Sequence, residues 1–146
     1  MRVTISASLR SVVVRSVAIA LVAFVGVSAA AQRPPALDQD FQLPAGRSIR
    51  LADTDLVVHF DRVERDSRCP ADVKCITAGD AVVVLGLAAG RESERLYELH
   101  TTSGDATAVH AGFRVTLVAL NPVPVSTRTL RARDYIATLR AARGRE

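Results

Sequence analysis

The chain has 146 residues, of which 49% are hydrophobic and 4% aromatic, and its formal net charge is +4. Three of the 19 basic residues and none of the 15 acidic residues precede position 32, so the remainder carries a net charge of about +1, which does not support nucleic-acid binding. The absence of tryptophan weakens sugar-binding and base-stacking functions, and the remaining length suits one domain with an aliphatic core.

Residues 1–31 have the pattern of a signal peptide. Three arginines precede an apolar run from Val17 to Val27, and Ser28-Ala29-Ala30-Ala31 places small residues where a signal peptidase cleaves. We expect cleavage before Gln32, a periplasmic or secreted protein, and no membrane contact after cleavage. A membrane anchor is the alternative, but the apolar core is shorter than the roughly 20 residues that a spanning helix needs. No cysteine stands at the cleavage point, which argues against lipid attachment there.

The rest of the chain predicts a linker, a β domain and a tail. Residues 32–45 contain Pro34-Pro35 and few apolar side chains, which favours an extended linker. The β domain is expected over residues 46–142 and a flexible tail over 143–146. Alternating apolar residues bounded by turn residues predict strands at 48–52, 56–63, 81–88, 94–101, 113–119 and 134–140, with 106–109 as a further candidate.

Six or seven short strands predict an all-β fold, a small single-domain β-sandwich or barrel. The residues at 81–88 are apolar on both faces, as in a central strand. In 56–63, Arg62 falls on the inward phase, so either the strand ends there or a bulge resets the register. The clearest two-residue period lies in 113–119, whereas 137–141 could also be helical.

Cys69 and Cys75 are the only cysteines, and in an exported chain they predict a disulfide. Metal binding by two thiolates and a histidine is the alternative. Its weakness is the spacing, which is longer than the two to four intervening residues usual for a thiolate pair. The Cys-x-x-Cys spacing of a catalytic redox pair is absent.

The segment around the cysteines is similar to one found in a group of short exported bacterial proteins, many of them lipoproteins. The similar residues are Asp66-Ser67-Arg68-Cys69-Pro70, Val73-Lys74-Cys75-Ile76 and Ala78-Gly79-Asp80-Ala81. Members usually carry tryptophan where this chain has Thr77. The resemblance extends weakly over most of the mature chain; it implies export and a small β domain, and no catalytic residues.

No residue pattern predicts catalysis. His59, His100 and His110 are isolated in sequence, although His59 and His100 could form a weak divalent site with Asp61 or Glu98 if their strands are neighbours. The serines lack a Gly-x-Ser-x-Gly context, and the acidic residues lack calcium-loop spacing. We therefore expect no enzymatic activity, no cofactor and no bound metal.

These observations favour an exported, monomeric, non-enzymatic binding domain. Its partner is expected to be a protein or peptide of the envelope or the exterior, because loops held by a rigid sandwich commonly carry recognition. The predicted binding loop comprises Asp66, Ser67, Arg68, Pro70 and Lys74. The alternative is a periplasmic metal-binding protein that uses its histidines.

Overall fold

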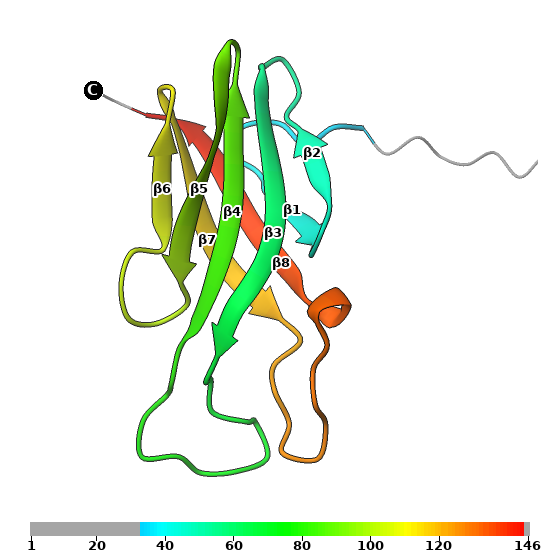
Figure 1. The fold of residues 1–146 in the computed structure, drawn as a ribbon, viewed down its shortest axis with the longest axis vertical. Helices are drawn as coiled ribbons and strands as arrows, with labels where there is room; N and C mark the ends of the chain where they lie inside the picture. The colour runs from blue at the N-terminus through cyan, green and yellow to red at the C-terminus, as the bar shows by residue number, and fades with distance from the viewer. Residues whose placement is uncertain (1–32, 145–146) are drawn as a thin grey trace, which may run out of the picture. The chain divides into compact units, whose positions relative to one another are not determined.

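The protein is a β-sandwich of two four-stranded antiparallel sheets, seen in a computed structural model that describes residues 33–144 (Figure 1). The first sheet has the order β1-β8-β7-β6, with strands β1 (Asp40–Pro44), β8 (Ile136–Arg143), β7 (Phe113–Asn121) and β6 (Thr107–His110). The second sheet has the order β2-β3-β4-β5, with strands β2 (Ser48–Arg50), β3 (Leu56–Asp66), β4 (Ala81–Ala89) and β5 (Glu92–His100). A 3₁₀ turn, η1 (Ala132–Asp134), precedes β8. No helix among the described residues is long and apolar enough to span a membrane.

The alternation in the sequence places the core side chains, and bulges change its phase. In β3, the register shifts between Phe60 and Arg62 and the strand continues to Asp66, so of the two alternatives at Arg62 the bulge is correct and the strand end is not. In β7, Phe113, Val115 and Leu117 point inward, and a shift between Leu117 and Ala119 then buries Leu120 in place of Ala119. The two-residue period predicted over 113–119 therefore breaks after Leu117, because a bulge inverts the alternation that follows it.

Strand β4 is buried on both faces, as its continuous apolar sequence predicts. Val83, Leu85 and Leu87 on one face belong to the main core, and Val82 and Val84 on the other face are also buried. The side chain of Glu94 on β5 lies directly over Gly86, so that a Cβ at position 86 would come within 1.8 Å of the Glu94 carboxylate. The same carboxylate lies 2.9 Å from His59 Nδ1 on β3. Glycine at position 86 thus leaves room for the Glu94 side chain and its contact with His59 across the strand.

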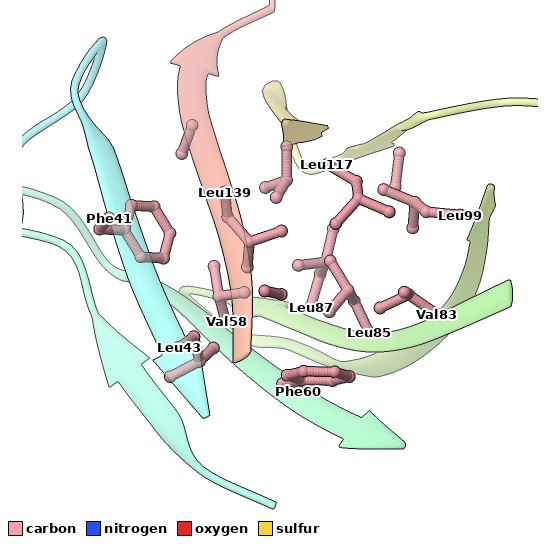
Figure 2. Packing of buried hydrophobic residues seen from close by; sticks show 14 of the residues in the cluster. Phe41, Leu43, Val58, Phe60, Val83, Leu85, Leu87, Leu99, Leu117 and Leu139 are labelled. Atoms are coloured by element: carbon pink, nitrogen blue, oxygen red, sulfur yellow. The ribbon is translucent and has the colours of Figure 1, made fainter. Parts of the chain in front are cut away.

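The core fills the space between the two sheets with aliphatic side chains and a few rings (Figure 2). Phe60 on β3 is fully buried and pairs with Leu85 of β4 across the ladder. The facing layer includes Leu139 from β8. The scarcity of aromatic residues in the sequence is therefore matched by a core made mainly of leucine, valine and alanine.

The domain begins earlier than the sequence suggested. Residues 40–44, inside the predicted linker 32–45, form β1, which pairs with β8 and buries Phe41 and Leu43 in the core. At the other end β8 continues to Arg143, the first residue of the predicted tail. Within the described part of the predicted linker, residues 33–39 and Ala45 lie outside the strands. The predicted signal peptide lies outside the described residues.

The strand count is eight, one or two more than expected. The two strands beyond the six main predictions are β1 and β6. The segment predicted at 134–140 forms a strand, β8, rather than a helix. The 113–119 prediction matches β7 closely, with β7 ending two residues later. Pairing with distant strands explains the gains, since β1 is stabilised by β8 nearly a hundred residues away.

Candidate binding surface at the disulfide-loop end

Two loops lie side by side at one end of the sandwich (Figure 1). The disulfide loop, residues 67–80, joins β3 to β4, and the facing loop, residues 122–135, joins β7 to β8. The amide of Ala71 donates to the carbonyl of Pro124 at 2.9 Å, and Asp72 accepts hydrogen bonds from the amide and hydroxyl of Ser126. We call the two loops together the loop end. The first and last described residues lie at the opposite end of the sandwich.

Cys69 and Cys75 form the predicted disulfide, with their Cα atoms 6.0 Å apart. The amide of Cys69 also donates to the carbonyl of Ala78 at 2.8 Å. The segment from Cys75 to Ala78, which contains Ile76, is therefore bonded to Cys69 at both of its ends. Such cross-links restrict the conformations open to the loop in the folded protein.

Arg68 forms a largely buried ion pair with Asp66 and also reaches the other sheet through backbone carbonyls. Its guanidinium donates to both carboxylate oxygens of Asp66, at 2.9 and 2.7 Å, and the side chains of the two residues are only 13% and 9% exposed. It also donates to the carbonyls of Leu120, at 2.5 Å, and Pro122, at 3.0 Å. Tyr135 donates its hydroxyl to Asp66 at 3.2 Å. This geometry fixes the start of the disulfide loop against the start of the facing loop.

The environment of Asp66 keeps it ionised. Burial alone would raise the pKa of this carboxyl, but the hydrogen bonds and charge of Arg68, with the hydroxyl of Tyr135, lower it overall. The pair thus retains opposite charges over the ordinary pH range. Its role in the structure is to hold the loop, rather than to offer a charged surface.

The five predicted binding-loop residues therefore divide into two groups. Asp66 and Arg68 direct their charged groups inward, and Ser67 donates its hydroxyl to the carbonyl of Asp80 at 2.9 Å. Pro70 is half-buried and accepts the amide of Val73 at 3.3 Å, whereas Lys74 is exposed. The side chains of Asp66 and Arg68 are thus engaged within the protein, whereas Ser67 and Lys74 are exposed, and a role of this loop in binding stays a prediction.

Asp80, at the end of the disulfide loop, accepts several hydrogen bonds from the end of β5 and the turn that follows it. One carboxylate oxygen accepts from His100 Nδ1 at 2.6 Å, and the other accepts the amides of Thr101 and Thr102 at 3.0 and 2.9 Å. Burial alone would raise its pKa, but the hydrogen bonds from His100, Thr102 and Thr101 outweigh burial and hold the pKa far below its ordinary value. Asp80 therefore links the disulfide loop to the end of β5.

Asp80→Asn is expected to lower the free energy of unfolding by about 2 kcal/mol at neutral pH, because hydrogen bonds to a charged acceptor are lost. A carboxyl whose pKa is depressed in the folded state stabilises the protein above its unfolded pKa, near 3.9. That stabilisation is lost progressively as the pH falls below this value. Urea unfolding at several pH values should show a wild-type-to-Asn difference that is constant from about pH 5 upward and shrinks below about pH 4. A difference that grows on acidification would contradict the assignment.

The three histidines are not brought together. His59 pairs with Glu94 at 2.9 Å, His100 with Asp80 at 2.6 Å, and His110 on β6 lies 3.1 Å from the hydroxyl of Tyr97. His59 and His100 lie on β3 and β5, with β4 between these strands, and their acidic partners differ from the predicted Asp61 and Glu98. Within residues 33–144, no group of three or more His, Cys, Asp or Glu side chains is placed to hold a metal ion.

The sequence did not indicate the apolar side chains that the loop end exposes. Val73 and Ile76 in the disulfide loop and Val123 and Val125 in the facing loop are all exposed, and Ile76 is fully so, at 105%. In the sequence, these residues could have been noticed as aliphatic side chains within two segments, 67–80 and 122–135, that lack strand alternation. A cleft of about 290 Å³ opens beside them; it is lined by Arg68, Cys69, Ala78, Thr101, Thr102, Leu117, Val118, Ala119, Leu120 and Val123. Comparisons of the chain with protein families, curated proteins and solved structures find no match.

Proposed function

We propose that this protein is an exported, non-enzymatic binding domain that presents its loop end to a protein or peptide of the cell envelope or the exterior. The observation that carries the proposal is Ile76, an aliphatic side chain fully exposed on a loop closed by a disulfide. Exposing such a side chain to water is unfavourable, and clustered exposed apolar residues commonly mark interaction sites. Val73 in the same loop and Val123 and Val125 in the facing loop are also exposed.

The bracing of the loop end supports a binding role. A flexible loop loses conformational entropy when it docks, and this loss weakens binding. Here the disulfide, the Arg68–Asp66 pair and the Asp72–Ser126 contact hold the loops before any partner arrives. The charged groups of Arg68, Asp66 and Asp72 are used in these internal contacts, which hold the shape of the surface.

Export and the absence of catalysis are parts of the same proposal. The disulfide is consistent with an oxidising compartment, and the leader-like residues 1–31 provide the route. The Asp80–His100 pair resembles a catalytic dyad, but we assign it a structural role. The second oxygen of Asp80 is occupied by Thr101 and Thr102, which ties the pair to the backbone.

A photo-crosslinking amino acid at position 76 tests the binding function in the cells that naturally produce the protein. We expect a light-dependent adduct with one defined protein from position 76. The matched control is position 109, an exposed valine on β6 in the other sheet. Replacing both cysteines by serine should reduce the adduct, since the loop loses its cross-link.

Two results would count against the proposal. Equal adducts from positions 76 and 109 would mean that capture is non-specific, and no adduct from position 76 would mean that the loop end meets no protein. Intact-mass analysis of the exported protein gives an independent check of localisation, because we expect a chain that begins at or near Gln32. Retention of Met1 in a membrane fraction would contradict signal cleavage.

A further inference from the structure

The loop end carries an excess of positive charge. Once the inward-facing Arg68–Asp66 pair is set aside, its cations are Lys74, Arg128, Arg131 and Arg133, and its exposed or half-exposed acids are Asp72 and Asp134. Both acids are already occupied. The oxygens of Asp72 accept from Ser126, and Asp134 accepts the amide of Arg131 and lies 3.6 Å from Arg128.

Three of these cations are therefore available to a partner. Among residues 33–144, Lys74, Arg131 and Arg133 form no ion pair with an acidic side chain. Lys74 stands two residues before Ile76 in the exposed part of the disulfide loop, so a cation and an apolar side chain are presented together. A complementary surface would place carboxylates beside an apolar pocket.

The shape of the loop end favours a partner of fixed shape. Ile76 projects fully from the disulfide loop, and the 290 Å³ cleft bordered by Ala78 and Val123 lies next to that loop. A projection beside a hollow is complementary to a surface that has both a pocket and a protruding side chain. A fluid lipid surface gains nothing from such a hollow, because it presents no fixed group to fill it.

We infer that the partner is an acidic protein segment that receives Ile76 in an apolar pocket, inserts an apolar side chain into the cleft, and pairs carboxylates with Lys74, Arg131 and Arg133. The inference rests on the proposed binding function and names the chemistry of the partner. Apolar contacts at the centre supply most of the affinity, and the surrounding charges supply orientation and speed of association.

A displayed library of random peptides, selected on the purified disulfide-bonded protein, tests this chemistry. We expect the enriched peptides to combine an aromatic or large aliphatic residue with several Asp or Glu residues. Affinity for a synthetic copy of an enriched peptide should fall about tenfold or more in Ile76→Asp and in Val123→Asp. It should stay unchanged in Val109→Asp, a matched substitution of an exposed aliphatic residue on β6.

Charge reversal tests the cationic part separately. Lys74→Glu should weaken binding about threefold at low salt, and the difference should vanish at about 1 M salt, where charges are screened. Arg91→Glu, at the β4–β5 turn, is the matched control. All variants should keep the disulfide and the unfolding midpoint of the wild type, since the altered side chains are exposed.

The outcomes separate this inference from the proposed function. Peptides that bind through Ile76 but lack acidic residues would overturn the inference and leave the binding function intact. Peptides whose affinity ignores both Ile76→Asp and Val123→Asp would overturn both. Binding to vesicles of phosphatidylcholine with phosphatidylglycerol, with no peptide enriched, would replace the acidic protein by an anionic lipid surface.

Discussion

Arg68→Ala is expected to lower the free energy of unfolding by about 3 kcal/mol. The substitution removes both hydrogen bonds to Asp66 and leaves that carboxylate buried beside Tyr135 without its counter-charge. It also leaves the carbonyls of Leu120 and Pro122 without the donor that joins the two sheets. Removing one partner of a buried pair costs more than the pair itself contributes, because the remaining charge stays desolvated.

Urea unfolding followed by circular dichroism measures this loss. Arg65→Ala is the matched control, because Arg65 is an exposed arginine near the end of β3, and its replacement should change stability by less than about 0.5 kcal/mol. Arg68→Lys should recover only part of the loss, since an ammonium cannot reproduce the two-pronged contact with Asp66. Equal effects of Arg68→Ala and Arg65→Ala would show that the pair does not hold the loops.

Phe60→Ala should cost about 4 kcal/mol, whereas Ile76→Ala should cost almost nothing. Phe60 is fully buried between the sheets, so truncation removes transfer energy and leaves a cavity that β3 and β4 cannot close. Ile76 is fully exposed, so its side chain contributes no buried area to the fold. The same pair of substitutions therefore separates residues kept for folding from a residue presented to a partner.

Thermal and urea unfolding of both variants provide the comparison. Phe60→Leu serves as an intermediate control and should cost about 1 kcal/mol, because most of the volume is retained. If Ile76→Ala instead lowered stability by more than about 1 kcal/mol, the exposed position of this side chain would be wrong in solution. That result would also remove the observation on which the proposed function depends.

The two-residue alternation made several strands predictable, because it depends only on neighbouring residues. The apolar run of β4 and the period of β7 are visible without knowledge of any partner strand. The same local pattern exists in β1, where Phe41 and Leu43 alternate with polar residues, but the prolines around it favoured a linker. What makes β1 a strand is its ladder with β8, which adjacent sequence does not reveal.

The chemistry of the candidate site was predictable only in part. Two cysteines in an exported chain predict a disulfide, and the structure contains it. The role of Arg68 was not predictable, because two of its partners are the carbonyls of Leu120 and Pro122, 52 and 54 residues along the chain. Similarly, the acceptor role of Asp80 depends on Thr101 and Thr102, more than 20 residues away.

By itself, the amino-acid sequence determined the all-β class, the central position of β4 and the pairing of the cysteines, since each follows from local periodicity or from composition. It left open whether β3 ends or bulges at Arg62, and the structure contains the bulge. Only the tertiary structure decided which side chains of residues 66–80 hold the fold and which face solvent. Burial is a property of segments that meet in space, so Arg68 could become internal and Ile76 fully exposed although they lie eight positions apart in one loop.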